Sequence, residues 1–450
     1  MNGREIPGFS WDPEKRKYFR IQANHVAPAG SQHSEQAVKK RKYESAVKKH
    51  REGVARRIEQ QRVRKSPLLT NPTSRIAAEI ESDPVRGFVK QSRQGEAFAS
   101  QLELHHGFDF KNITPAGTIA DFARHDESGA LLIGINSTFD CEFVVCPSFA
   151  QEKGGEISDA PTNTSNFGLG HRFSSLSLND SGAFLATMDS NSEGKSMLLV
   201  GIVRNNLMDG NPVRSRDLCT GMIIHDSSMW CSAAKPGSDN DPIFAIGTSD
   251  GLYILRDRGG MDLIHANITL PTRRPRGASE DVDLLALDWL SPTVIATGFR
   301  NSLVGLYDVR SRGFATRIKH PRSVGQVKRV DENRLVVAGY RSMQMYDLRF
   351  PSKRGILSNS CLTFQDYDNE FRHQIDLNSE LGLVASITDG ERIHFHSLAD
   401  GSSIPTRRSV DRDMAATNRI MFENPQGVSG VGQYPRLLAS RGTVVAELAW

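Results

Sequence analysis

The chain has 450 residues, of which 38% are hydrophobic and 24% charged, values typical of a folded soluble protein rather than a fibrous, disordered or membrane-embedded one. Its net charge of +4 conceals two unlike parts, since residues 1–65 hold 17 Lys and Arg against 7 Asp and Glu. That surplus of 10 leaves −6 for the rest of the chain. Five scattered cysteines, no apolar leader and no apolar run longer than a strand predict a soluble protein of a reducing intracellular compartment, without a membrane partner.

The first predicted element is an aromatic hairpin within residues 1–33. The stretch FSWDPEKRKYFRI at 9–21 places an Asp-Pro-Glu-Lys turn between two short aromatic segments, a pattern typical of a β-hairpin. Two interpretations carry equal weight. Either the rings of Phe9, Trp11, Tyr18 and Phe19 only cap the following domain, or the hairpin has a function of its own.

Residues 34–99 are predicted to form a basic extension, helical or disordered, that ends in a linker. Between 34 and 65 there is no proline and one glycine, and Tyr43, Val47, Val54 and Ile58 follow one another at spacings of 4, 7 and 4. This spacing indicates a helix with a narrow apolar stripe. The stretch SPLLTNPTS interrupts it, a second short helix is predicted at 74–82, and 83–99 resemble a linker.

The basic helix has several possible functions. The cluster Lys39, Lys40, Arg41 and Lys42 is typical of a nuclear import signal, which favours a nuclear protein with or without a cytoplasmic pool. The alternatives are a solvated arm, a contact with nucleic acid, or insertion into a protein partner. No aromatic residues alternate with the basic ones along this helix, so the sequence does not support base-specific readout of nucleic acid there.

The body of the chain, residues 100–450, repeats a strand pattern seven times. A short aliphatic run ending in small residues recurs at an average spacing of 51 residues: LLIGI at 131, FLATM at 184, FAIGTS at 244, VIATGF at 294, LVVAGY at 335, LVASI at 383 and LLASR at 437. Each run follows another apolar segment, and most precede a third. Units of three or four short strands cannot bury both faces alone, so we predict an all-β fold, a seven-bladed β-propeller.

The ring is predicted to close at the C-terminus. The last strand, around Val444–Leu448, needs a partner within its own blade, and the segment at 102–110 is the candidate.

In two successive units the third segment ends in the same pattern of four residues, aromatic, Asp, aliphatic and Arg. These tetrads are YDVR at 307–310 and YDLR at 346–349. In each, an aromatic ring should pack between blades, an aspartate should fix the turn, and an arginine two places later should emerge at the rim of the ring. Because the two units are adjacent, the two arginines should lie side by side and suit an acidic or carbonyl-rich partner. The predicted partner-binding residues are Tyr307, Asp308, Arg310, Tyr346, Asp347 and Arg349.

These boxes resemble those of the WD-repeat substrate receptors of cullin-4 ubiquitin ligases, the DDB-and-cullin-associated factor class. VIATGFRNSLVGLYDVR at 294–310 follows the family pattern with Asn301-Ser302 in place of Asp-Gly and Tyr307 in place of Trp, while the box at 335–349 is two residues shorter in its turn. The opening IPGFSWDPEKRKYFRI at 6–21 is similar to the fourth-numbered branch of that class, in its fungal or plant relatives. In that family the arginine of the box contacts the adaptor, damage-specific DNA-binding protein 1.

The resemblance implies a non-enzymatic substrate receptor that docks on this adaptor and the cullin-4 ligase core and presents a protein target, which the sequence does not identify. The alternative is a generic nuclear WD-repeat scaffold of chromatin or ribosome assembly. Enzyme motifs are absent, because the chain has no P-loop and no GxSxG, and GVSGVG at 427 lacks a following helix. His394 and His396 share a strand face but have no third ligand in register, so neither a metal nor another cofactor is expected.

Overall fold

The computed structural model describes 20 stretches of the chain, and the statements below concern these residues. They are 7–12, 15–23, 33–61, 84–125, 128–137, 141–146, 157–159, 165–168, 171–189, 194–203, 219–237, 242–257, 261–266, 283–349, 356–357, 359–369, 374–388, 392–406, 417–423 and 435–449. The chain divides into two compact units, residues 1–71 and 72–450. The short helix predicted at 74–82, the end of the basic segment at 62–65 and the loop at 427 lie outside the described residues. Within the described part, no helix is long and apolar enough to cross a membrane.

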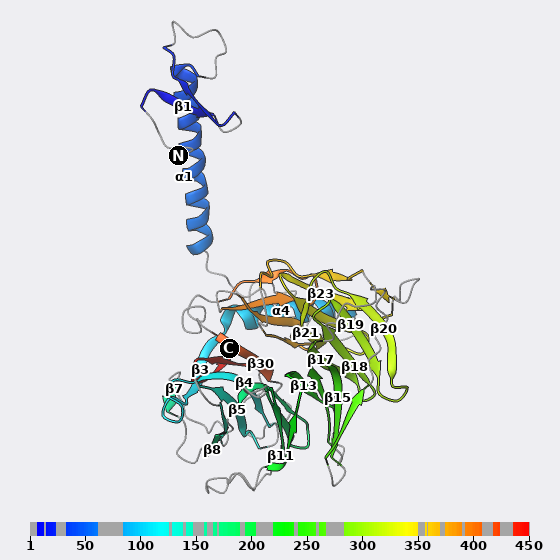
Figure 1. The fold of residues 1–450 in the computed structure, drawn as a ribbon. Helices are drawn as coiled ribbons and strands as arrows, with labels where there is room; N and C mark the ends of the chain where they lie inside the picture. Colours follow the sequence, from blue (N-terminus) through cyan, green and yellow to red (C-terminus); the bar gives the residue numbers. More distant parts are fainter. Residues whose placement is uncertain are drawn as a thin grey trace. The chain divides into compact units, whose positions relative to one another are not determined.

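The first unit contains the predicted hairpin and one long helix (Figure 1). Strands β1 (Phe9–Asp12) and β2 (Lys17–Arg20) pair antiparallel, and α1 (Glu35–Gln61) follows. Ser34 caps α1, because its Oγ accepts a hydrogen bond from the Ala37 N–H at 3.3 Å. The predictions of an aromatic hairpin and of a basic helix are therefore confirmed for the described residues.

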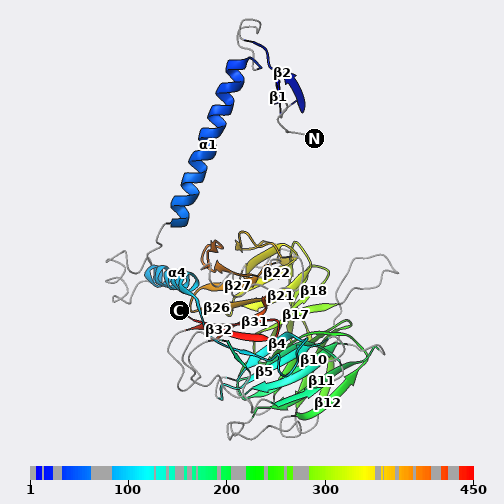
Figure 2. The same ribbon diagram turned by 90° about the vertical axis from the view of Figure 1, so that its left-hand side faces the viewer.

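The second unit contains seven β-sheets, each of four or five strands among the described residues (Figures 1 and 2). The first three blades are β4 (Thr118–Arg124), β5 (Leu131–Asn136), β6 (Cys141–Cys146) and β8 (Ser165–Gly168); β9 (Arg172–Leu178), β10 (Ala183–Asp189), β11 (Ser196–Ile202) and β12 (Cys219–His225); and β13 (Met229–Ala234), β14 (Ile243–Thr248), β15 (Gly251–Asp257) and β16 (Met261–Ala266).

The fourth blade is β17 (Leu284–Ser291), β18 (Val294–Phe299), β19 (Leu303–Asp308) and β20 (Gly313–Lys319), with β24 (Ile356–Leu357) added in parallel. The fifth is β21 (Val324–Arg329), β22 (Arg334–Gly339), β23 (Ser342–Asp347) and β25 (Leu362–Thr363), and the sixth is β26 (Ile375–Asn378), β27 (Leu383–Ile387), β28 (Ile393–Ser397) and β29 (Ser403–Ile404). The seventh is β30 (Thr417–Glu423), β31 (Arg436–Arg441), β32 (Val444–Ala449) and β3 (Glu103–Asp109), with β7 (Ile157–Asp159) in parallel.

The seven sheets form a closed ring. The first strand of each blade contacts the first strand of the next, in the order β4, β9, β13, β17, β21, β26 and β30, and β30 returns to β4. Each of the seven aliphatic runs found in the sequence is the second strand of its blade. These strands are apolar at nearly every position because neighbouring blades bury both of their faces. The predicted seven-bladed propeller is confirmed.

The seventh blade closes as predicted. β3 pairs antiparallel with β32, so that the start and the end of the propeller share one sheet. Leu104 lies opposite Leu448, and Phe108 lies opposite Val445. Leu448 and Val445 are fully buried, so the ring is held by core packing as well as by the hydrogen-bond ladder.

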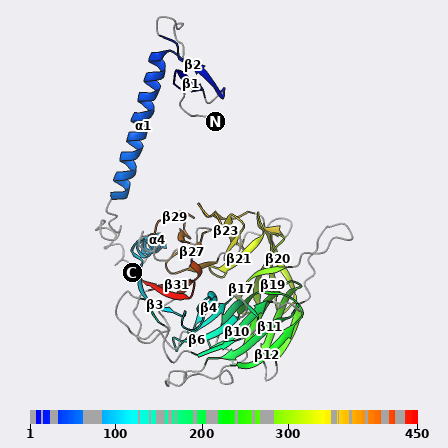
Figure 3. The ribbon, with the colours of Figure 1, turned by 60° about the vertical axis from the view of Figure 1, so that its left-hand side comes forward.

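Residues 84–101 differ from the prediction. The segment expected to be a linker forms most of helix α4 (Pro84–Gln101), which packs on the sixth blade (Figure 3). Phe98 is fully buried in a core cluster that includes Leu383. A Cβ on Gly95 would lie 2.5 Å from the Leu381 carbonyl oxygen, so this glycine permits the close approach of helix and blade. Glycines lower helix propensity, and this tertiary contact outweighs that cost.

Candidate functional site

Two places on the propeller gather polar side chains, namely the rim at which the two tetrads end and the channel along the ring axis. The tetrads lie where expected, because Asp308 ends β19 and Asp347 ends β23, each the third strand of its blade. The fourth and fifth blades are neighbours, since β17 contacts β21. As all blades run their strands in the same sense, both arginines emerge at the same rim.

Arg310 has a partner within its own tetrad. Its backbone N–H donates a hydrogen bond to Asp308 Oδ1 at 2.8 Å, and its guanidinium lies 3.4 Å from the same carboxylate. The Arg310 side chain is nevertheless 73% exposed. The backbone and guanidinium N–H groups of Arg310 lower the pKa of Asp308. The carboxylate therefore orients the arginine without covering it.

Arg349 repeats this geometry with shorter distances. Its backbone N–H donates to Asp347 Oδ1 at 3.0 Å, and its Nη2 lies 2.6 Å from Asp347 Oδ2. The Arg349 side chain remains 61% exposed, while that of Asp347 is 9% exposed. The guanidinium holds the pKa of Asp347 below its usual range, and the carboxylate raises the pKa of Arg349. In both tetrads the arginine stands two residues after the aspartate, where the carboxylate can pair with its guanidinium and orient it.

A groove of about 410 Å³ lies beside the second tetrad. Besides Asp347 and Arg349 it is lined by Asp331, Asn333, Arg334, Met345, Cys361, Leu362 and Ala399. Arg334 pairs with Asp331 at 2.7 Å, so the groove presents two oriented guanidinium groups next to apolar side chains.

The two tyrosines require a correction. Sequence reasoning grouped Tyr307 and Tyr346 with the partner-binding residues, but their rings lie in the core, at 2% and 0% exposure. The Tyr346 hydroxyl donates to Gln344 Oε1 at 2.8 Å and lies 3.1 Å from His320 Nδ1. Burial raises the pKa of Tyr346 to about 12 and lowers that of His320 to about 4. The rings position the rim residues and are not themselves accessible.

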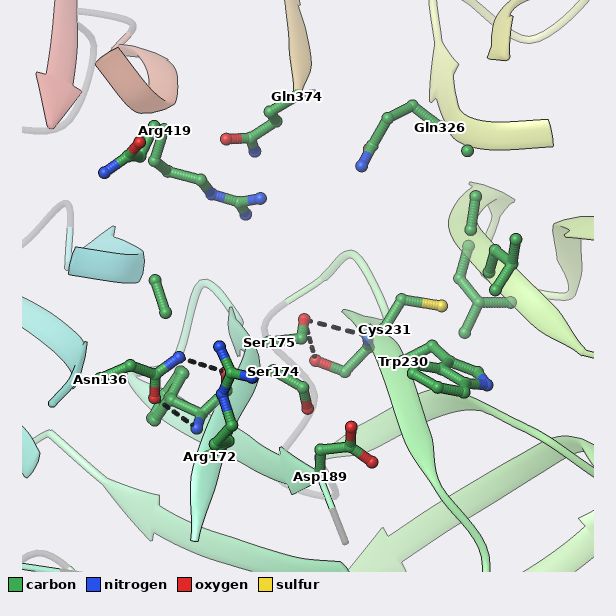
Figure 4. A pocket seen from close by; sticks show the side chains of 18 of the residues that line it. Asn136, Arg172, Ser174, Ser175, Asp189, Trp230, Cys231, Gln326, Gln374 and Arg419 are labelled. Carbon is green, nitrogen blue, oxygen red and sulfur yellow. Dashed lines mark hydrogen bonds between the residues drawn. The ribbon is translucent and has the colours of Figure 1, made fainter. Parts of the chain in front are cut away.

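The channel along the ring axis is a polar cavity of about 380 Å³ (Figure 4). Its lining comes from the first strands of the blades and their immediate neighbours. Figure 4 shows Arg419, Gln374 and Gln326 on one side and Arg172 and Trp230 on the other.

Two cations of this channel, Arg419 and Lys328, form ion pairs with aspartates of neighbouring blades. Arg419 Nε lies 2.6 Å from the buried carboxylate of Asp121, and Lys328 Nζ lies 2.9 Å from Asp376. Burial works against the charge of Lys328, but Asp376 and Asp288 outweigh burial and raise its pKa. These two ion pairs link neighbouring blades and so help to hold the ring together.

Three of these aspartates join neighbouring blades through the backbone. Asp121 Oδ2 accepts a hydrogen bond from Leu176 N–H at 2.8 Å, which ties β4 to β9. In the same way, Asp288 accepts from the N–H of the β21 residue Arg329 at 2.6 Å, and Asp376 from that of the β30 residue at 422 at 2.7 Å. Burial raises the pKa of both Asp121 and Asp288. Sequence reasoning missed this set, although each aspartate stands between apolar residues in the first strand of its unit, as in IADFA, LALDW and QIDL.

The histidines considered as metal ligands do not gather a third group. His396 is fully buried with Nε2 3.3 Å from Ser386 Oγ, and burial lowers its pKa to about 4. Among the described residues, no group of three His, Cys, Asp or Glu side chains could hold a metal ion. The structure therefore gives His396 a role within its blade.

The comparisons with known proteins identify the fold and no narrower family. No protein-family model matches the sequence, and no curated protein matches it significantly. One similar solved structure is the β-propeller domain of Myceliophteria thermophila Cps50 (Swd1), with a TM-score of 0.49, 12% identity and coverage of 74% of this chain and 97% of that one. A second is the COPII outer coat vertex on membranes, with a TM-score of 0.54, 13% identity and coverage of 76% of this chain and 84% of that one. A third is the COPII coat assembled on membranes, with a TM-score of 0.54, 13% identity and coverage of 76% of this chain and 47% of that one.

At such identities the likeness shows the fold alone. The chain is a seven-bladed β-propeller preceded by an N-terminal helical region.

Proposed function

We propose that this propeller is a non-enzymatic substrate receptor that docks on damage-specific DNA-binding protein 1, the adaptor of the cullin-4 ubiquitin ligase, through the rim carrying Arg310 and Arg349. The observation that supports it best is the pair of exposed guanidinium groups in adjacent blades, each oriented by an aspartate of its own tetrad. The similarity of the two boxes to the receptor family supplies the identity of the partner.

The aspartates make these arginines better suited to docking than ordinary surface arginines. A long side chain loses rotamer freedom when it binds, and a carboxylate that already restricts it reduces that loss. An ion pair as exposed as Arg310 with Asp308 contributes little to folding, so the geometry is more useful to a partner than to the blade. The groove beside Arg349 adds the half-buried Leu362, which a partner's apolar side chain could cover.

In this function the chain supplies proximity and no chemistry. Holding a target beside a ligase raises the effective concentration of its lysines, and the transfer of ubiquitin occurs elsewhere in the complex. The alternative, a nuclear scaffold of chromatin or ribosome assembly, uses the same fold without the adaptor.

Arginine variants test the proposal, with controls at the other rim of the same hairpins. Arg310→Ala is expected to weaken binding to the purified adaptor about tenfold or more, as for a charged hydrogen-bonding group at an interface centre. Arg349→Ala is expected to weaken it less, because its box is shorter, and the double variant most. Arg300 and Arg341 are matched controls, since each is exposed and paired with an aspartate, at 2.7 Å and 3.1 Å, at the opposite end of β18–β19 or β22–β23.

Binding is measured by calorimetry, and folding by thermal melting. Full adaptor affinity in the folded double variant, or equal losses in the Arg300→Ala and Arg341→Ala controls, would remove the rim from the interface. Failure of the intact protein to retain the adaptor on affinity purification, together with recovery of a chromatin or ribosome assembly, would favour the alternative.

A further inference from the structure

The hairpin of the first unit has two unlike faces. Residues directly opposite in an antiparallel pair point to the same side, so Phe9 and Arg20 share one face with Trp11 and Tyr18. The Trp11 and Tyr18 rings lie 4.7 Å apart between centroids. We call these four side chains the aromatic face.

The opposite face turns toward the start of α1. Phe19 stacks on His33 at 4.3 Å between ring centroids, just before the helix begins. Backbone hydrogen bonds fix this junction, from Gln22 N–H to the His33 carbonyl and from Glu35 N–H to the Gln22 carbonyl, both at 3.0 Å. The aromatic face therefore points away from the helix start, and Phe9 is 44% exposed.

Arg20 lies on this face, and further exposed basic side chains stand elsewhere in the same unit. On the hairpin, Arg16, Lys17 and Arg20 are exposed, and Arg16 stands in the turn with a φ of 51°. On α1, further basic residues are exposed, among them Lys40, Arg41, Lys48 and Lys49. Exposed rings beside a dense positive charge are costly for folding alone and complement a ligand that is both planar and anionic.

We propose that the aromatic face, which includes Arg20 and adjoins Arg16 in the turn, forms a binding site for single-stranded nucleic acid. Bases stack on Phe9 and on the Trp11–Tyr18 pair, which stand two residues apart on β1 and are therefore separated by about 6.8 Å. Arg20, directly opposite Phe9, reaches the phosphate between them, and the basic residues of α1 hold the backbone that continues beyond. The site shares no residue with the rim of the propeller that carries Arg310 and Arg349.

The pairing of features selects this ligand class over others. A duplex keeps its bases stacked inside and would use only the charges, and an acidic protein segment would use the charges without needing an exposed ring. The basic helix by itself has no alternating aromatics, and the hairpin supplies them. Stacking is tolerant of base identity, so no sequence preference is expected.

Fluorescence anisotropy of the full-length protein with a labelled 20-nucleotide oligo(U) RNA tests the site. Phe9→Ala is expected to weaken binding about 5- to 150-fold, the range measured for loss of one stacking ring, whereas Phe9→Trp keeps the affinity. Tyr43→Ala is the matched control, because Tyr43 is 72% exposed on α1 but lies off the aromatic face. Arg20→Ala is expected to weaken binding and to make the salt dependence shallower by about 0.7 in log–log slope.

Several outcomes would overturn the proposal. Equal effects of Phe9→Ala and Tyr43→Ala, or none, would show that stacking on the hairpin is absent. Equal affinity for a duplex of the same length, or full displacement by polyglutamate at equal charge, would show a general polyanion surface. Circular dichroism checks the fold of each variant, and adaptor binding, measured in parallel, is expected to be unchanged by Phe9→Ala.

Discussion

The buried histidine between the fourth and fifth blades predicts a specific loss of stability in mild acid. His320 is fully buried beside Tyr346, and burial lowers its pKa to about 4 from an ordinary value of 6.5. Because the folded-state pKa is depressed, the unfolded chain binds more protons than the folded one below about pH 6.5. The stability contributed by neutral His320 is therefore present above that pH and is lost as the pH falls toward 4.

The size of the effect follows from the two pKa values. The difference between the two pKa values lowers the unfolding free energy by about 3 kcal/mol once His320 is protonated in both states, and by about 2 kcal/mol at pH 5. His320→Gln removes the titrating group and keeps a donor for the Tyr346 hydroxyl. Between pH 7 and pH 5 the parent protein should thus lose about 2 kcal/mol more unfolding free energy than the variant.

Urea unfolding followed by tryptophan fluorescence at both pH values measures this difference. The comparison uses the change with pH in each protein, so a constant packing loss in the variant cancels. His265→Gln is the control, because it makes the same substitution at an exposed histidine. Identical pH dependence in the parent and His320→Gln proteins would refute the reasoning.

The other predictions concern the ring and the basic helix. Asp121→Ala should lower the unfolding free energy by about 2–4 kcal/mol in urea titrations, because it strands the buried N–H of Leu176, whereas the exposed Asp262→Ala should change it by less than about 0.5 kcal/mol. Leu448→Ala should cost about 2–5 kcal/mol by opening a cavity where the ring closes, and a smaller loss would mean that β32 contributes little to closure. Replacing Lys39–Lys42 by alanines should move the tagged protein to the cytoplasm in fluorescence microscopy, and unchanged nuclear retention would contradict an import signal there.

Local pattern was enough to predict the blades and their number. Each blade needs a buried second strand, and burial on both faces demands the aliphatic runs that recur at an average of 51 residues. The same logic predicted that β32 pairs with β3, because a strand at the end of a ring must find a partner in its own blade. The hairpin and α1 were also readable, since turn residues and helical spacing act over a few positions.

Local pattern failed where the decisive contact comes from far along the chain. Helix α4 lies in a segment that was predicted to be a linker, and the close approach of Gly95 to Leu381, on which the helix packs, has no local signature in the sequence. The tetrad tyrosines were predicted both to pack between blades and to belong to the partner-binding set, and the structure shows that their burial leaves them inaccessible to a partner.

A basic, partly helical head, seven strand units and two arginines at equivalent positions could be predicted from the chain alone, because these features follow from spacing along it. The tertiary structure decided what each polar group faces. Asp121 meets Leu176 and Arg419 only because ring closure brings the first, second and seventh blades to one axis, across as many as 298 residues of chain. Such contacts leave no repeating pattern in the sequence, because they join residues of different blades that only ring closure brings together.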